Sequence, residues 1–286
     1  MPVTMTETKG HSTRIEPLLD EHRDAALAFL CERPLHTVII AGLLRQYGAV
    51  VPSPAGRFYA CRDTRGGFDG VALIGRATMF EARGEAAITD FAMQARLCPS
   101  VRMIMGEAGD LKSFWEHYAA DDHAPRLFCR ELFYESSRPF SRGDGVEGLR
   151  QATLDDLDQI VLAHARMVFE ESGVNPLAAD AEGFHQRCAQ RVERGKVWTL
   201  IEKGDLIFKA DILTETPEAT YIEGVWVSPA HRFKGYGRSC WASLSRALLD
   251  RAPAFCWFVN AQNQAARSFY ERVGGVSFGD YDKVYL

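Results

Sequence analysis

The chain has 286 residues, is 47% hydrophobic and 25% charged, and carries 33 basic against 38 acidic residues, for a formal net charge of -5. This composition is typical of soluble globular proteins and excludes disordered, collagen-like and disulfide-scaffold classes. No basic stripe is present, which argues against binding to nucleic acid. The length predicts two domains of about 140 residues each.

Targeting, membrane and metal signals are missing from the sequence. The longest apolar run, Val38–Leu44, is too short to cross a bilayer, and the N-terminus contains no apolar block typical of a signal peptide. The seven cysteines are scattered, form no C-x-x-C pair and have no histidine at zinc-ligand spacing. We therefore expect a cytoplasmic protein with reduced thiols, no metal and no membrane contact.

The first half predicts a blurred alternation of strands and helices. Its apolar run at 38–44 is most simply a buried helix. Further helices are predicted at 85–98 and 110–118, and strands at 57–62, 71–74, 101–105 and 126–134.

The segment Ser136–Gly148 is the clearest compositional break in the chain. It is rich in Ser, Gly and Pro and poor in apolar residues, so it is expected to be a linker. The predicted domains are therefore 1–138 and 146–286.

The second half gives a clearer pattern. Thr153 and Asp156 form a capping-box-like start to a helix that runs towards Glu171, and Gly195 ends a second helix that begins at Ala181. An α/β fold with a mixed sheet follows from this order. The other predicted helices are 237–251 and 264–273, and the strands are 197–201, 206–210, 220–227, 255–259, 276–278 and 283–286.

The strongest local signal is Arg232-x-x-Gly235-x-Gly237, which follows a strand and opens a helix. The glycines allow successive backbone N–H groups to point at one place, and the helix N-terminus adds partial positive charge. Lys234 and Arg238 add full charges, so a pyrophosphate fits this turn better than a carboxylate. The alternative is a tight strand-to-helix turn that happens to contain two glycines. The pattern is neither a Walker loop nor G-x-G-x-x-G.

A second motif, Asn263-x-x-Ala-x-x-Phe-Tyr270-x-x-x-Gly274, follows the next strand. The two motifs in this order resemble the GNAT superfamily of acyl-CoA-dependent N-acyltransferases, and the resemblance covers 146–286. The family motif normally ends Gly-Phe, whereas Gly275 and Val276 follow here. The segments Met167–Pro176, Phe208–Ala210 and Gly224–Val227 also resemble a two-domain subgroup of that superfamily, in which an N-terminal domain of unknown function precedes the acetyltransferase domain. The resemblance implies tandem GNAT-like domains, each a mixed, mostly antiparallel twisted sheet flanked by helices, with a degenerate N-terminal copy.

The resemblance implies acetyl-CoA as the donor. Its pyrophosphate would lie on the amides from Arg232 to Arg238, and its pantetheine arm would pair with backbone groups of Val225 and Val227. Tyr270 would protonate the departing thiolate. The expected cofactor-binding residues are Val225, Trp226, Val227, Arg232, Phe233, Lys234, Gly235, Tyr236, Gly237, Arg238, Asn263 and Tyr270. Of these, Trp226 is expected to point its side chain away from Val225, into the core.

Direct acyl transfer in a ternary complex requires a base for the amine, donors for the developing oxyanion and an acid for the thiolate. Strand alternation would place Tyr221, Glu223, Val225 and Val227 on one face, which makes Glu223 the best candidate base. A strand carboxylate paired with a nearby cation such as Lys209 is an equally open interpretation.

Other titratable residues carry weaker signals. Glu170 and Glu171 could shape an acceptor pocket, but a solvated charged turn is the simpler interpretation. His231 is expected to be exposed, and His164 and His185 half-buried or exposed.

The first half has one glycine and two carboxylates around 79–85, where a second phosphate turn would lie. This copy could therefore cap the acceptor site, form a homodimer surface or bind a ligand of its own.

These observations predict an N-acetyltransferase that acts on a primary amine of a small molecule or a protein. The alternative is a non-catalytic acyl-CoA-binding sensor.

Overall fold

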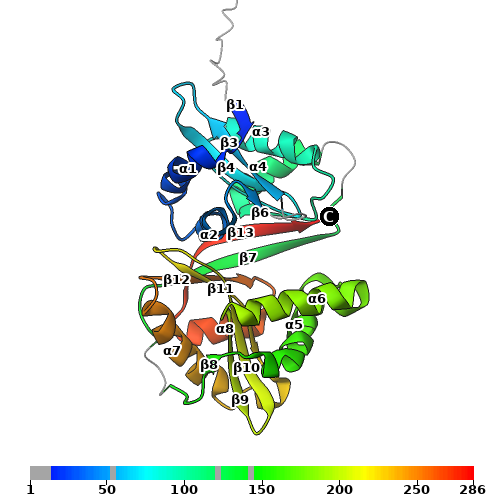
Figure 1. The fold of residues 1–286 in the computed structure, drawn as a ribbon, viewed down its shortest axis with the longest axis vertical. Helices are drawn as coiled ribbons and strands as arrows, with labels where there is room; N and C mark the ends of the chain where they lie inside the picture. The colour runs from blue at the N-terminus through cyan, green and yellow to red at the C-terminus, as the bar shows by residue number, and fades with distance from the viewer. Residues whose placement is uncertain (1–13, 52–55, 120–123, 141–144) are drawn as a thin grey trace, which may run out of the picture. The chain divides into compact units, whose positions relative to one another are not determined.

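The computed structural model describes residues 14–51, 56–119, 124–140 and 145–286. The chain forms two compact units that exchange short segments (Figure 1). The first unit comprises the described residues of Met1–Arg33 and Leu43–Arg130 together with Tyr281–Leu286, and the second comprises Pro34–Gly42 and Glu131–Asp280. The boundaries 1–138 and 146–286 stay a prediction. Across the described residues, no helix has the length and apolar character needed to span a membrane.

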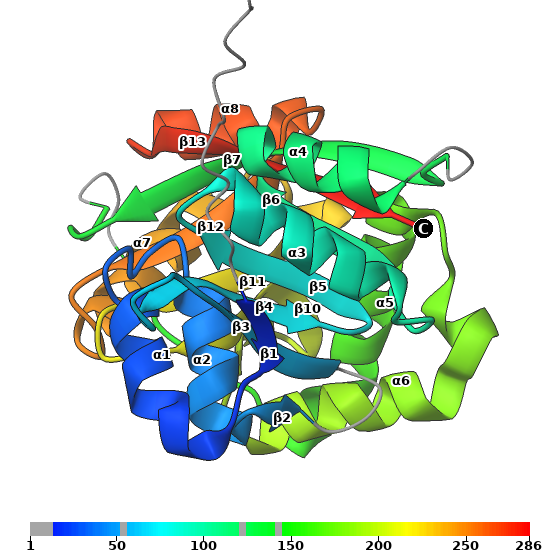
Figure 2. The ribbon, with the colours of Figure 1, turned by 90° about the horizontal axis from the view of Figure 1, so that it is seen from above.

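The first unit is built on a sheet with the strand order β1-β3-β4-β5-β6-β13. β5 and β6 are parallel, and the other neighbours are antiparallel. α3 and α4 pack on one face of this sheet through an apolar core (Figure 2). Its elements are β1 (Arg14–Pro17), η1 (Asp20–His22), α1 (Arg23–Leu30), β2 (Val50–Val51), β3 (Gly56–Arg62), β4 (Phe68–Ile74), β5 (Ala77–Ala82), α3 (Glu85–Arg96), β6 (Met103–Glu107) and α4 (Ala108–Tyr118), and α2 (Val38–Tyr47) is divided between the units.

The second unit is built on a sheet with the order β7-β12-β11-β10-β9-β8. Only β11 and β12 are parallel neighbours in it. Its elements are β7 (Leu127–Ser136), β8 (Arg150–Gln151), η2 (Leu154–Asp156), α5 (Leu157–Ser172), α6 (Pro176–Glu193), β9 (Val197–Glu202), β10 (Asp205–Glu215), β11 (Thr220–Val227), η3 (Pro229–His231), α7 (Tyr236–Leu249), β12 (Phe255–Asn260), α8 (Gln264–Arg272) and the start of β13 (Val276–Tyr285).

Both units follow one plan. Three antiparallel strands precede a helix, a parallel strand and a second helix, and an antiparallel strand completes each sheet. That last strand comes from the other half of the sequence, since β13 pairs with β6 and β7 pairs with β12. The prediction of tandem, mostly antiparallel mixed sheets flanked by helices is confirmed.

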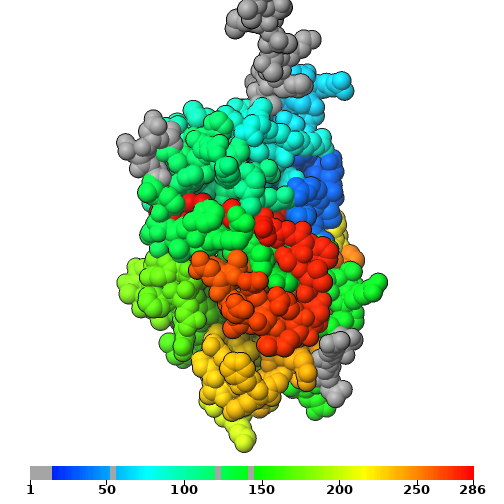
Figure 3. All heavy atoms as spheres, turned by 180° about the vertical axis from the view of Figure 1, so that it is seen from behind, coloured from blue at the N-terminus to red at the C-terminus, as the bar shows by residue number. Residues whose placement is uncertain are grey.

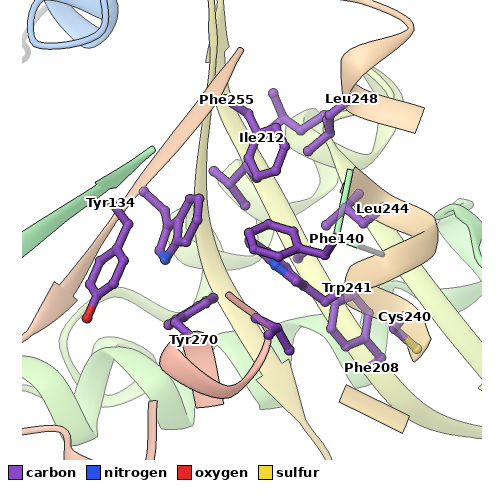
Figure 4. Close-up of a cluster of buried hydrophobic side chains, with 14 of the residues drawn as sticks. Tyr134, Phe140, Phe208, Ile212, Cys240, Trp241, Leu244, Leu248, Phe255 and Tyr270 are labelled. Atoms are coloured by element: carbon purple, nitrogen blue, oxygen red, sulfur yellow. The ribbon is translucent and has the colours of Figure 1, made fainter. Parts of the chain in front are cut away.

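Helices cover both faces of the second sheet. α7 and α8 enclose a large aromatic core whose members include Trp241, Phe255 and Tyr270 (Figure 4). α5 and α6 enclose a second apolar cluster on the other face. Phe140, from the segment expected to be a linker, is buried in the aromatic core, where its ring packs at a tilt against that of Trp241, with 5.9 Å between the centroids.

Most local signals of the second half are confirmed. Thr153 and Asp156 form the predicted capping box, and α5 ends at Gly173 in the left-handed conformation. α6 begins earlier than expected, at Pro176, because the Asn175 side chain caps it and a kink at Asp180 divides it. The two short strands expected at the C-terminus are one continuous β13.

Candidate functional site

The parallel strands β11 and β12 pair over only part of their lengths. Three register pairs join them, from Thr220 with Phe255 to Ile222 with Trp257. β11 then continues to Val227, and no further pair joins the two strands in the described part of the chain. The β12-facing edge of the end of β11 therefore has no strand partner, and its backbone groups are available to a ligand.

The turn between β11 and α7 has the shape that the glycine motif predicts. Gly235 caps α7 with a φ of +91°, and Phe233 also has a positive φ, +62°, which is uncommon for a residue with a side chain. Arg238 and Ser239 donate their N–H groups to the Gly235 carbonyl. The N–H groups of the two residues before them, Tyr236 and Gly237, have no acceptor within the helix, so they form an anion-binding end.

The two motif glycines have different structural roles. A Cβ on Gly235 would meet nothing within 4 Å, so space beside it is open, whereas a Cβ on Gly237 would lie 3.3 Å from Val227 Cγ2 and 3.4 Å from Phe269. Gly237 therefore lets the end of β11, the start of α7 and α8 approach closely. In Figure 3, the gold surface around the start of α7 adjoins the orange surface of α8.

The positive charges of the turn lie at its surface. Arg232, Lys234 and Arg238 are exposed, and Arg232 Nε donates to the Val227 carbonyl at 3.2 Å. Residues 228–238 contain no acidic side chain. The backbone amides and the three cations thus form a site whose chemistry fits a pyrophosphate.

Tyr236 and His231 differ from a simple exposed turn. The Tyr236 hydroxyl donates to Glu202 Oε2 at 2.7 Å, and this hydrogen bond raises the pKa of Tyr236. His231 is half-buried, not exposed as expected, because its ring packs against the Tyr236 ring at 5.7 Å. Because the Tyr236 side chain is engaged in these contacts, only its backbone N–H group contributes to the anion site.

β11 contains a bulge at Gly224, whose φ is +60°. Because the bulge adds a residue, Ile222 before it and Val225 and Val227 after it all pack against the same aromatic core. Glu223 faces the other side of the sheet, towards α6. The expectation that Glu223 shares a face with Val225 and Val227 is therefore wrong, since strict alternation fails at the glycine.

Trp226 follows the expected direction. Its side chain packs against the cluster beneath α5 and α6, on the face opposite Val225. Its side chain is therefore a core element.

Glu223 belongs to a network of charged side chains on the α5 and α6 face of the sheet. Its carboxylate lies 3.0 Å from Arg191 Nη1, which is also 3.4 Å from Asp211 Oδ2. Lys209 Nζ, fully buried, donates to Asp211 Oδ2 at 2.7 Å. Glu223 is thus paired with a cation, although the partner is Arg191 and not Lys209.

The charges of this network are fixed by their surroundings. Burial alone would raise the pKa of Asp211, but Lys209 and Arg191 outweigh it and lower that pKa. His164 Nδ1 lies 3.6 Å from Asp211 Oδ2, yet burial and then Lys209 lower the His164 pKa to about 3. His164 is therefore neutral near pH 7, and its contact with Asp211 is not an ion pair.

Tyr270 lies within the aromatic core of the second unit. Its ring centroid is 5.0 Å from that of Trp257 and 5.2 Å from that of Trp241, and Tyr134 lies at 5.8 Å (Figure 4). Burial, and then the neighbouring Tyr134, raises the pKa of Tyr270. The phenol therefore keeps its proton at neutral pH and can act as an acid.

Stability at alkaline pH follows from this burial. The folded chain holds the Tyr270 proton, while the unfolded chain releases it near the ordinary pKa of about 10. The contribution of Tyr270 to the free energy of unfolding is therefore constant below about pH 10. It is lost as the pH rises towards the pKa of the folded state, by up to about 1.4 kcal/mol per pH unit. Denaturant midpoints between about pH 9 and about pH 11 should fall less steeply for Tyr270→Phe than for the unaltered chain. Equal slopes would contradict the assignment.

Asn263 has a structural role already. Its Oδ1 accepts from the Ala266 N–H at 3.0 Å and caps α8, which leaves the side-chain NH2 group as a donor. Glu170 and Glu171 are exposed, and Glu170 pairs with Arg166 at 2.9 Å, as a solvated helix end would.

The described residues of the first unit have no comparable turn between β5 and α3. β5 ends at Ala82 and α3 begins at Glu85, so Arg83 and Gly84 alone join them, and Glu85 occupies the first helical turn. The carboxylate of Glu85 lies where a pyrophosphate would bind the start of α3, and the two negative charges would repel each other.

Comparisons with known proteins agree with this geometry. Residues 167–275 match the model of the Acetyltransferase (GNAT) family. The fold is similar to that of a GNAT-family acetyltransferase from Colwellia psychrerythraea, with a TM-score of 0.60 at 12% identity over 96% of this chain and 99% of that one. It is also similar to a tandem GNAT protein from the clavulanic acid biosynthesis pathway, with a TM-score of 0.62 at 12% identity over 96% and 98%.

A GCN5-related N-acetyltransferase from Sphaerobacter thermophilus gives a TM-score of 0.58 at 14% identity, over 96% of this chain and 95% of that one. No curated protein matches the sequence. Residues 167–275 therefore form a GNAT domain, and the chain as a whole has the tandem GNAT fold.

Several residues of the site were not foreseen. The sequence analysis did not predict that the bulge at Gly224 is joined to the buried pair of Lys209 and Asp211. Two charged residues two positions apart in the apolar run of β10 could have indicated a buried ion pair. The sequence contains no signal for Arg191, because α6 contacts the strands only in the folded chain.

Proposed function

We propose that this protein is an N-acetyltransferase that transfers an acetyl group from acetyl-CoA directly to a primary amine. The observation that carries the proposal is the turn from Arg232 to Arg238, which offers helix-end amides, three cations and open space beside Gly235. This chemistry fits the pyrophosphate of coenzyme A.

The rest of the donor would lie along the open edge of β11. Backbone groups of Val225 and Val227 would pair with the amides of the pantetheine arm as an added strand does, and the Asn263 side-chain NH2 would donate nearby. Coenzyme A, when loaded, supplies an acyl group activated as a thioester.

The transfer needs a donor to the carbonyl oxygen and a proton for the departing sulfur. A backbone N–H of the bulged segment of β11 would stabilise the oxyanion, and Tyr270 would supply the proton. The high pKa of Tyr270, caused by burial, keeps this proton in place until the thiolate forms.

Glu223 is the proposed base, acting on the amine through an ordered water. Its ion pair with Arg191 holds the carboxylate on the α5 and α6 face, whereas Val225 and Tyr270 lie on the other face, so the water is needed to connect Glu223 to the amine. The amine loses its proton through the water to Glu223. The new C–N bond then forms, the C–S bond breaks, and the thiolate takes the proton of Tyr270. The amine itself belongs to a small molecule or to a protein.

The first unit is proposed to be a degenerate copy without a donor site of its own. The two-residue connection before α3 and the carboxylate of Glu85 support this. Its role would be to form a contact with a second copy of the chain or to bind a ligand of its own.

Thiol release tests the proposed function. The full chain, incubated with acetyl-CoA and a pool of primary amines, is expected to release free thiol only when amines are present. Release that does not depend on amines would contradict transfer to an amine.

A non-catalytic acyl-CoA sensor is the second candidate, favoured by the ion pair that already engages Glu223. Tight binding of acetyl-CoA without amine-dependent thiol release would support the sensor over the enzyme.

A further inference from the structure

A buried lysine contacts the bulge of β11 directly. Lys209 has no solvent exposure, and its Nζ lies 3.3 Å from the Gly224 carbonyl oxygen as well as 2.7 Å from Asp211 Oδ2. One ammonium group thus joins a carboxylate of β10 to the backbone of β11 at the bulge, where the register of the two strands shifts between Lys209 and Asp211.

The bulge and the ion pair fit each other closely. A Cβ on Gly224 would lie 2.9 Å from Asp211 Oδ2 and 3.1 Å from Lys209 Nζ, both closer than ordinary contacts. The φ of +60° at Gly224 also favours glycine. The ion pair therefore occupies the space that only a missing side chain leaves.

The contact fixes the direction of a neighbouring donor. The Gly224 C=O and the Val225 N–H belong to one peptide unit, which is planar and trans, so the two bonds point in opposite directions. Because the carbonyl points at Lys209 Nζ, the Val225 N–H points away from the α5 and α6 face. Val225 packs against the aromatic core on the other face, where Tyr270 also lies.

We propose that Lys209 is a positioning residue for acyl transfer: by holding the Gly224 carbonyl, it aims the Val225 N–H at the carbonyl oxygen of the bound thioester. The inference rests on the proposed function for its catalytic consequence, but not for the geometry of the bulge. Buried ion pairs add little net stability, so the main contribution of Lys209 is this fixed peptide orientation.

The test compares two double variants of the full chain. Lys209→Met/Asp211→Leu removes both buried charges together, so that neither remains unpaired. Lys196→Met/Glu215→Leu removes an ion pair of the same chemistry, between the residue before β9 and the last residue of β10. Both are characterised by amide NMR with labelled glycine and valine, by coenzyme A titration, and by kcat and KM with acetyl-CoA and pooled amines.

The Lys209→Met/Asp211→Leu variant should shift or broaden the Gly224 and Val225 amide signals without added ligand. Its kcat should fall roughly 100-fold, the scale for loss of one oxyanion donor, while its coenzyme A affinity stays unchanged. The Lys196→Met/Glu215→Leu control should leave both signals and kcat as they are.

Unchanged Gly224 and Val225 signals in Lys209→Met/Asp211→Leu would overturn the inference, as would a loss confined to coenzyme A affinity. If the unaltered chain transfers no acetyl group, the proposed function fails, and the amide signals still decide whether Lys209 sets the bulge. If Lys209→Met/Asp211→Leu does not fold, the proposal is contradicted, because the ion pair of Lys209 and Asp211 would then be needed for the fold itself. The Gly224 and Val225 amide signals of the single variant Lys209→Met check that outcome.

Discussion

A Gly235→Glu variant is expected to bind coenzyme A at least about 100-fold more weakly than the unaltered chain. The substitution places a carboxylate beside the helix-end amides that would hold the pyrophosphate, so the two anions repel. It also forces a residue with a side chain to adopt a φ of +91°. Calorimetric titration with coenzyme A measures the effect.

Gly204→Glu is the matched control. Gly204 has a φ of +87°, and a Cβ there, like one at Gly235, would meet nothing within 4 Å. The two variants therefore add the same charge and similar backbone strain, but Gly204 lies in the β9–β10 turn. Equal affinities in both variants would contradict a phosphate site at Gly235.

The second large effect is expected at Tyr270. Tyr270→Phe removes the proposed proton source and keeps the ring in its aromatic core, so kcat should fall roughly 100-fold while coenzyme A affinity is unchanged. The measurement is steady-state thiol release together with a coenzyme A titration.

Tyr134→Phe provides the comparison for this substitution. Its ring lies 5.8 Å from that of Tyr270 in the same core, and burial raises its pKa too. It should keep its turnover. A similar loss of turnover in both variants would mean that the core needs both hydroxyl groups for its structure. It would contradict a specific role of Tyr270 as the acid.

The sequence predicted the elements whose signals are local. The capping box of Thr153 and Asp156 and the glycine turn before α7 depend on residues close together in the chain, and the structure has both. Their positions follow from backbone conformations that these residue types favour over short distances.

The sequence could not predict features that neighbouring strands impose. The bulge at Gly224 depends on Lys209 and Asp211 across the sheet, so alternation along β11 alone placed Glu223 on the wrong face. The pairing of Glu223 with Arg191 likewise depends on how α6 packs. The continuous β13 forms because β6 pairs with its second half, which outweighs the turn tendency of Gly279 and Asp280.

A crystal structure of the full chain with coenzyme A would show whether the start of α7 binds the pyrophosphate. We expect pyrophosphate oxygens within hydrogen-bond distance of backbone N–H groups between Phe233 and Arg238. Coenzyme A bound elsewhere, with those amides facing solvent, would contradict this expectation.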